Sequence, residues 1–258
     1  MTETRTHEAV VNAQFGARAA VYLKSAVHAA GADLDALTDL VRGHGEAWVL
    51  DLGCGAGHVS FAAAPHVREV VACDLSPEML SVVAKAARER GLENITTRQS
   101  MAENLPFPDA HFDFVLSRYS THHWGDLDAG LREIARVLKP GGAVAIADTV
   151  SPGTPRLDTF LQAIELLRDP SHVRSRSWAE WLEALARAGL SERNARSFRI
   201  RLEFDTWVAR MRTPKIQADA IRALEAAMPA SVVAYFDIGP DGSFSMDTAL
   251  FEAVKPAF

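Results

Sequence analysis

A glycine-rich loop at residues 51–57 is the clearest segment of this sequence able to do chemistry. It reads DLGCGAG and follows the short apolar run at 47–50. Its alternate glycines, Gly53, Gly55 and Gly57, allow the backbone to pass close beneath a flat or charged ligand, where a Cβ atom would collide with it. The helix expected next would offer free N–H groups and the positive end of its dipole to a carboxylate or phosphate. The loop therefore predicts a ligand-binding turn between a first strand and a first helix.

Two carboxylates accompany this loop. Asp51 stands at its start, and Asp74 lies 23 positions further on (74 − 51), where the strand expected at 67–73 ends. At the end of a second strand, a carboxylate can accept hydrogen bonds from the ribose hydroxyls of an adenosine ligand. Asp51 would repel a pyrophosphate but attract a ligand that carries sulfonium and ammonium groups. The pair favours an adenosine ligand with positive charge.

The spacing of the glycines argues against a dinucleotide. The dinucleotide fingerprint is G-x-G-x-x-G/A. Counted from Gly53 its last position falls on His58, and counted from Gly55 it falls on Ser60. A nicotinamide-dependent oxidoreductase therefore stays an alternative with a mismatched loop.

A pair of histidines follows the fourth expected strand, in the segment SRYSTHHW at 117–124. This is the sheet edge where ligands of α/β proteins bind. If a reaction here removes a proton from a hydroxyl or an acidic carbon, a histidine is matched to neutral pH. His122 or His123 is the candidate base; otherwise one of them caps the next helix or packs against Trp124. Arg118 could bind a carboxylate of the ligand or form a structural ion pair.

The elements that must position these residues alternate between strand and helix. Strands are expected at 47–50, 67–73, 94–98, 112–117 and 143–148, and helices at 58–64, 77–90 and 126–138. Ser76 followed by Pro77 is a favourable start for the second of these helices. Such alternation predicts a parallel sheet with right-handed crossovers and helices on both faces.

The flanking segments are expected to be mainly helical. Apolar residues recur at helical spacing over 12–40, which predicts one N-terminal helix. After residue 153, helices are expected at 155–168, 178–188 and 206–228, a strand at 198–204 and a last strand at 244–254. We expect these helices to form an insertion over the edge of the sheet within a single domain.

Composition excludes several classes of function. Of 258 residues, 48% are apolar and 23% charged, which is ordinary for a globular protein with a full core. The net charge of −6 disfavours a nucleic-acid partner. Cys54 and Cys73 have no metal-ligand spacing, so no metal is expected. There is no apolar signal core or stretch of 18 apolar residues, so we expect a cytoplasmic protein without stable membrane insertion.

The motifs also carry a family resemblance. The loop DLGCGAG resembles motif I of the class I S-adenosylmethionine-dependent methyltransferases, most closely the ubiquinone/menaquinone-biosynthesis C-methyltransferase branch. The likeness continues in the same order through DLSPEML at 74–80, AENLPF at 102–107, FD at 112–113 and VLKPGG at 137–142. It covers roughly residues 45–150.

This resemblance implies a fold and a division of the chain. The fold would be a Rossmann-like, seven-stranded, mostly parallel sheet of the class I methyltransferase type. Residues 1–44 would form a helical lid and 45–150 the cofactor-binding core. Residues 151–240 would hold the insertion with the sixth strand, and 241–258 the last strand.

The same resemblance implies S-adenosylmethionine as cofactor, S-adenosylhomocysteine as product, and a set of cofactor-binding residues. Asp51 and Gly53 would hold the methionine end, Asp74 the ribose, and Leu75 and Met79 the adenine. Two backbone groups would take part, the amide of Ala102 at the adenine edge and the carbonyl of Ser117 at the ammonium group. Gly55, Gly57, Arg118 and Tyr22 complete the set, and Tyr22 with Phe15 resembles a pair that closes a lid in related enzymes. Met101 departs from the family, which often has aspartate there, and cannot accept a hydrogen bond from the adenine amino group.

These observations predict an enzyme that transfers a methyl group in line to a small-molecule acceptor. A nucleic-acid methyltransferase is disfavoured by the acidic balance and by SRYS where such enzymes carry Asn/Asp-Pro-Pro-aromatic. A non-catalytic S-adenosylmethionine-binding protein is a further alternative. The Gly-Leu-Arg-Asn-like segment associated with quinone methylation is absent, so the acceptor, the choice among C-, O- and N-methylation, and the oligomeric state stay open.

Overall fold

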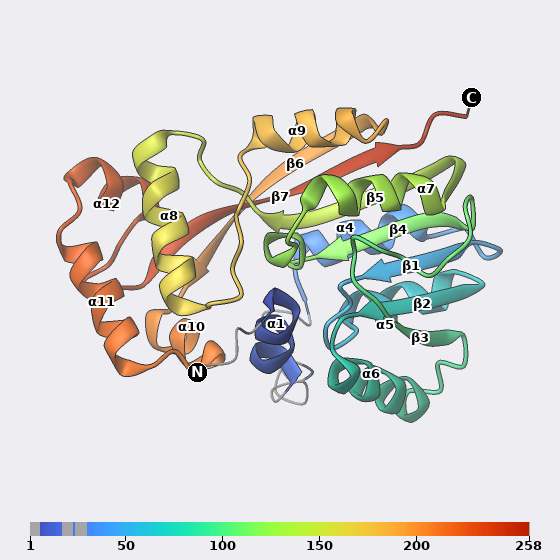
Figure 1. Cartoon of the computed structure of the whole chain (residues 1–258), viewed down its shortest axis with the longest axis horizontal. Coiled ribbons are helices and arrows are strands. Elements are labelled where there is room, and N and C mark those ends of the chain that lie inside the picture. The colour runs from blue at the N-terminus through green and yellow to red at the C-terminus, as the bar shows by residue number, and fades with distance from the viewer. Residues whose placement is uncertain (1–5, 17–22, 24–29, 258) are drawn as a thin grey trace.

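A seven-stranded sheet forms the centre of the computed structural model, which describes residues 6–16, 23 and 30–257 (Figure 1). The strand order is β3-β2-β1-β4-β5-β7-β6. Strands β1 to β5 are parallel, while β7 runs antiparallel to both β5 and β6. The prediction of a seven-stranded, mostly parallel sheet is confirmed. The strands are β1 (Trp48–Leu52), β2 (Glu69–Asp74), β3 (Ile95–Gln99), β4 (Phe112–Arg118), β5 (Leu138–Thr149), β6 (Ser191–Leu202) and β7 (Phe244–Val254).

The predicted strand positions are close for β1 to β4, whereas β5, expected at 143–148, begins at Leu138 and β6 is the least well predicted. Strand β6 was expected to begin at 198 but begins at Ser191, where it pairs with Val254 of β7. As the edge strand it is largely exposed and begins with the polar sequence SERNARS. Because no apolar run marks this half of the strand, the sequence pattern did not reveal it.

Helices cover both faces of the sheet. On one face α4 (Ala32–Val41), α5 (His58–Ala63) and α6 (Pro77–Glu89) pack on strand residues such as Val49, Val70 and Phe114. On the other face α7 (Leu127–Val137) and α9 (Trp178–Arg187) pack on Leu50 and Val115. Burial on both faces explains why the central strands are continuous apolar runs. Two short 3-10 helices, η2 (Ala64–His66) and η3 (Thr121–His123), lie in the connections.

Four helices form a lobe beyond the ends of β6 and β7, on the left of Figure 1. They are α8 (Pro155–Arg168), α10 (Phe204–Met211), α11 (Lys215–Ala226) and α12 (Ala230–Phe236). The lobe has its own apolar cluster, which includes Phe160, Trp207 and Ile221. The single helix expected at 206–228 is wrong, because Arg212 adopts a left-handed conformation (φ 51°) and Pro214 follows it. Helix α12 was not predicted.

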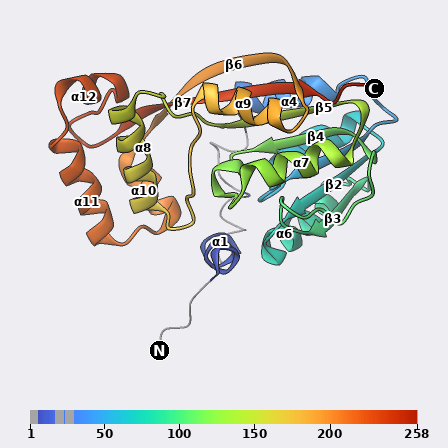
Figure 2. The same ribbon diagram turned by 45° about the horizontal axis from the view of Figure 1, so that its top comes forward.

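The expectation of one helix over 12–40 is also wrong. Helix α1 (His7–Phe15) ends early, and α4 starts anew after Gly31, whose φ of 142° no helix allows. Helix α1 lies between the lobe and the α6 side of the sheet in both views (Figures 1 and 2). His7 Nε2 lies 2.7 Å from the carbonyl oxygen of His123, and the Gln14 amide donates to the carbonyl of Met211 at 3.4 Å. Tyr22 lies outside the described residues.

Within the described part of the chain, no helix is long and apolar enough to cross a membrane.

Candidate active site

The three loop glycines have three different structural reasons. At Gly53 (φ 70°) a Cβ atom would lie 1.8 Å from Ser120 Oγ, so glycine lets the loop after β4 approach the loop after β1. At Gly57 (φ 88°) it would lie 2.9 Å from Phe61 and Val83, so glycine lets α5 pack against α6. At Gly55 (φ 50°) a Cβ atom would meet nothing within 4 Å. Gly55 therefore keeps the space above the loop open.

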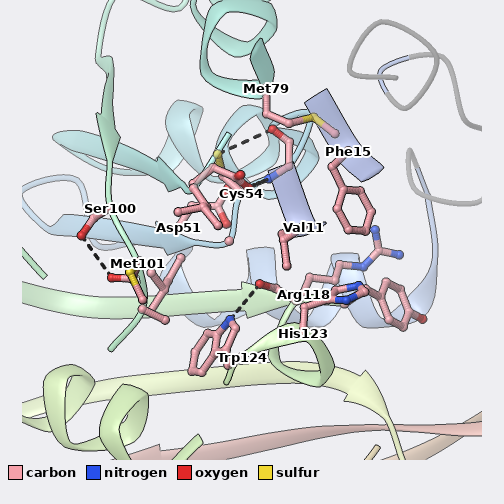
Figure 3. Close-up of a pocket in the computed structure, with 18 of the residues that line it drawn as sticks. Val11, Phe15, Asp51, Cys54, Met79, Ser100, Met101, Arg118, His123 and Trp124 are labelled. Atoms are coloured by element: carbon pink, nitrogen blue, oxygen red, sulfur yellow. Dashed lines mark hydrogen bonds between the residues drawn. The ribbon is translucent and has the colours of Figure 1, made fainter. Parts of the chain in front are cut away.

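That space is a cavity of about 390 Å³ where β1 and β4 lie side by side (Figure 3). The strand order reverses at this point, which is where open α/β sheets bind their ligands. Its volume is within the range of small-molecule sites. Most of the predicted cofactor-binding residues line it: Asp51, Gly53, Gly55, Asp74, Leu75, Met79, Ala102 and Arg118. Gly57 and Ser117 do not line it.

Asp51 is the least satisfied polar group of this cavity. Its side chain is almost fully buried, and Oδ2 accepts hydrogen bonds from the amide (2.9 Å) and hydroxyl (2.6 Å) of Ser60. Oδ1 is buried and has no hydrogen-bond partner among the described residues. Burial raises the pKa of Asp51 to about 7, because the charged carboxylate is poorly solvated. An oxygen in this condition fits a ligand that brings positive charge.

Asp74 is held in place by the backbone around it. Oδ2 accepts from the amide of Gly55 at 2.8 Å, and Oδ1 accepts from the amide of Ser76 at 2.9 Å. Burial raises the pKa of Asp74, and these hydrogen bonds oppose that effect. Each carboxylate oxygen has two lone pairs, so both can accept further hydrogen bonds from a ligand. The fixed carboxylate suits a pair of ribose hydroxyls.

Apolar side chains surround the cavity beside Asp74. Met79 is buried, Met101 is partly exposed, and Leu75 and Ala102 also line the cavity. Figure 3 shows Met79 and Met101 among the residues around the cavity. The Ser100 hydroxyl donates to the carbonyl of Asn104 at 2.7 Å, which shapes the turn that carries Met101. This part of the wall suits a flat, weakly polar ring such as adenine.

Arg118 forms an ion pair inside the protein. Its Nε and Nη2 contact the two carboxylate oxygens of Asp33 at 2.6 and 3.0 Å, and both side chains are buried. The guanidinium also lies 5.0 Å from the centroid of the Tyr119 ring. Of the two interpretations of Arg118, the structure shows the ion pair, which ties α4 to the end of β4. The side chain still lines the cavity.

The two candidate histidines have different surroundings. His123 lines the cofactor-sized cavity, and its Nδ1 lies 3.1 Å from the carbonyl oxygen of Ser171. Burial and the neighbouring His122 lower the pKa of His123 to about 3, so this ring is neutral. His122 does not line that cavity; its Nδ1 lies 2.6 Å from Oδ1 of Asp148.

Asp148, at the end of β5, contacts His122 and was not among the residues predicted from the sequence. It is fully buried. Burial opposes its ionisation, but His122 and hydrogen bonds from Thr121 and Thr149 lower its pKa below the usual value. Burial also favours a neutral His122, yet the carboxylate outweighs this effect and raises the pKa of His122. An acidic residue at the end of a predicted strand was the available signal.

Fold and cavity together define an enzyme of the class I methyltransferase type. A family model described as a methyltransferase domain matches residues 50–146. The chain is 34% identical over 246 residues to "Uncharacterized methyltransferase YcgJ" of Bacillus subtilis, an alignment that covers 93% of this chain and 97% of that protein. The crystal structure of YcgJ superposes with a TM-score of 0.84 at 33% identity, covering 87% and 98% of the two chains.

Two further relatives are similar to this chain. It is 49% identical over 205 residues to "Uncharacterized protein YafE" of Escherichia coli, covering 80% of this chain and 99% of YafE. It is 39% identical over 109 residues to the ubiquinone/menaquinone biosynthesis C-methyltransferase UbiE of Shewanella oneidensis, covering 40% and 43% of the chains. The chain belongs to the class I S-adenosylmethionine-dependent methyltransferases. This membership decides against a nicotinamide-dependent oxidoreductase.

Proposed function

We propose that this enzyme binds S-adenosylmethionine in the 390 Å³ cavity and methylates a small-molecule acceptor. The observation that carries the proposal is Asp51 Oδ1, a buried carboxylate oxygen without a partner among the described residues, in a residue that lines the cavity. A buried, unpaired carboxylate is costly unless a ligand compensates it. The ammonium and sulfonium groups of S-adenosylmethionine would supply that compensation.

The residues around the cavity suggest how each part of the cofactor is held. Asp51 would face the positively charged methionine end, with Gly53 and Gly55 providing close backbone approach. Asp74 would accept hydrogen bonds from the ribose hydroxyls. The adenine would pack between Leu75 and Met79, with the amide of Ala102 at its edge.

Ser117 and Gly57 would contribute to the cofactor site indirectly. Ser117 is fully buried and pairs with Ile146 of β5, while the next three residues line the cavity. Its contribution would be to fix where those residues leave the sheet. Gly57 would act through the packing of α5.

Methyl transfer requires little from the protein beyond positioning the two reactants. The cofactor supplies a methyl group bound to a sulfonium sulfur. An electron pair of the acceptor attacks the methyl carbon in line and displaces the sulfur. Positioning and exclusion of water therefore provide most of the acceleration. A small acceptor is supported by the net charge of −6, which disfavours a phosphate backbone, and by helix α1, whose Val11 and Phe15 line the cavity.

Calorimetric titration with S-adenosylhomocysteine, with NAD as the control ligand, tests the proposal. We expect micromolar affinity for S-adenosylhomocysteine alone. Asp74→Ala should weaken binding by about 1–3 kcal/mol, the cost of unmade hydrogen bonds at a polar site. Asp109→Ala is the matched control, because Asp109 is exposed and pairs with Arg136 at the surface.

A folded protein that binds neither ligand would refute the proposed cofactor site. Unchanged affinity in Asp74→Ala would remove Asp74 from the ribose role. Binding without methyl transfer to any small molecule would favour the non-catalytic alternative.

A further inference from the structure

A second, smaller cavity of about 90 Å³ adjoins the cofactor-sized cavity. Phe15, Tyr119 and His123 line both cavities, so they form the wall between them. The far side of the smaller cavity belongs to the helical lobe and the ends of β6 and β7, and includes Trp207 and Met246. The position places this cavity where an acceptor could reach a methyl group held in the larger one.

The smaller cavity is lined by equal numbers of positively and negatively charged side chains. Arg168 and Arg210 line it together with Glu165 and Asp169, two cations and two anions. Arg168 Nη1 contacts Glu165 Oε2 at 3.0 Å. The Asp169 carboxylate accepts hydrogen bonds from the amide (2.9 Å) and hydroxyl (2.6 Å) of Ser171. A wall of this kind does not favour a strongly charged acceptor head.

His122 is the ring of this cavity that is equipped to exchange a proton. Its Nδ1 is tied to Asp148 Oδ1 at 2.6 Å, and Asp148 is fully buried and ionised. Asp148 also accepts from Thr121 Oγ1, from the backbone amide of His122 at 3.3 Å and from that of Thr149 at 2.7 Å. These bonds fix the carboxylate, and the carboxylate keeps a proton on Nδ1.

The other ring nitrogen of His122 is therefore the one that can accept a proton. Nε2 makes no hydrogen bond within the described ranges, and the side chain keeps 14% of its exposure while it lines the cavity. His123 cannot do the same work as well. Its ring is neutral with a pKa of about 3, so it is a weak base.

Resting on the proposed function, we propose that the smaller cavity seats the reactive head of the acceptor and that the Asp148–His122 pair removes its proton. The substrate class is a neutral molecule with a weakly acidic O–H or C–H. The acceptor's proton goes to His122 Nε2 and its electron pair forms the bond to the methyl carbon. The carbon–sulfur bond breaks with its electrons on sulfur, so charge and atoms balance. Since a cavity of about 150 Å³ holds benzene, the smaller cavity can enclose the reactive O–H or C–H group but not a whole ring.

Several charged groups surround His122 and set its response to pH. Asp148 faces it from β5, and Glu165 and Asp169 face it from the end of α8. The ring centroids of His123 and His172 lie 4.1 and 5.8 Å from that of His122. The carboxylates favour the protonated ring, while burial disfavours it. Turnover should therefore rise with pH as His122 loses its proton, and removing the Asp148 charge should move this limb to lower pH.

The test uses the full chain with labelled S-adenosylmethionine and two pairs of probes. Acetylacetone and phenol have an acidic proton to lose, whereas pyridine and dimethyl sulfide are nucleophiles with none. Methylation should be confined to the first pair. His122→Gln should lower kcat by roughly 100-fold or more, the usual contribution of a general base, with S-adenosylhomocysteine affinity unchanged. His66→Gln, in η2 and in neither cavity wall, is the control that should keep full activity.

A second measurement reads the His122 ring directly. Nitrogen-15 NMR of histidine-labelled protein with S-adenosylhomocysteine should show neutral His122 with its proton on Nδ1, and Asp148→Asn should lower its pKa. Methylation of pyridine or dimethyl sulfide, no methylation of either acidic probe, full turnover in His122→Gln, or a proton on Nε2 of the neutral ring would each overturn the proposal. Intact S-adenosylhomocysteine binding in those cases would leave the proposed cofactor site standing.

Discussion

Binding of the cofactor should release a proton from Asp51. Without ligand the pKa of Asp51 is raised to about 7 by burial, so the carboxyl is largely protonated at pH 6. A cation placed against Oδ1 favours the ionised form and should return the pKa to its ordinary acidic range. At pH 6 a group with a pKa of 7 is about 90% protonated, so about 0.9 proton should leave for each S-adenosylhomocysteine bound.

The same linkage sets the pH dependence of affinity. When the pKa of a group falls on binding, the binding affinity increases with pH until the pH exceeds the pKa of that group in the free protein. Each unit of pH below 7 should therefore weaken binding about tenfold, and the affinity at pH 8 should exceed that at pH 5 by about 100-fold. Above pH 8 the dependence on Asp51 should vanish.

Calorimetry in two buffers of different ionisation enthalpy measures the released protons. The wild type and Asp51→Asn should be compared at pH 6 and pH 8, with Asp74→Asn as the matched carboxylate control. Burial also raises the pKa of Asp74, so this control shows how much of the signal is its own. Equal proton release by wild type and Asp51→Asn at pH 6 would refute the assignment of the cation to Asp51.

Four further outcomes follow from single positions in the structure. Gly55→Ala should cost about 1–2 kcal/mol of stability from its positive φ and also weaken S-adenosylhomocysteine binding. Gly53→Ala should lower the melting temperature much further, because its Cβ overlaps a neighbouring side chain; equal melting temperatures would contradict this. Asp33→Asn should destabilise the fold by about 3–5 kcal/mol by leaving Arg118 buried without its anion, which urea unfolding would measure. Burial raises the pKa of Glu225 to about 7, so its stabilising effect is present at pH 4 and lost as pH rises through 7; Glu225→Gln should raise stability by up to about 3 kcal/mol at pH 8 but not at pH 4, and a uniform gain would count against this reasoning.

The part of the site that could be predicted from the sequence consists of residues that lie close together along the chain. Asp51 and the glycines form one turn, and Asp74 ends the next strand along the chain, where it bonds to the Gly55 amide. The order of elements alone brings these residues together. The central strands were predictable for a similar reason, because burial on both faces makes each a short apolar run.

The missed contacts join residues that only the assembled sheet brings together. Arg118 and Asp33 are 85 positions apart, and their ion pair depends on how α4 packs beside β4. Likewise, His122 follows β4 and Asp148 ends β5, and they meet because these strands are neighbours in the sheet. The choice between an ion pair and a ligand contact, or between two adjacent histidines, depends on such packing.

Two buried aspartates at strand ends have surroundings that suit two different roles, cofactor binding and methyl transfer. Asp51 at the end of β1 has one oxygen without a partner among the described residues, and burial raises its pKa. Asp148 at the end of β5 has hydrogen bonds to both oxygens and a lowered pKa. The chain thus leaves the charge of the first to be compensated by a ligand and compensates the second by itself. Asp51→Asn should therefore weaken S-adenosylhomocysteine binding, whereas Asp148→Asn should leave that binding unchanged and slow methyl transfer; the reverse pattern would contradict the division of roles.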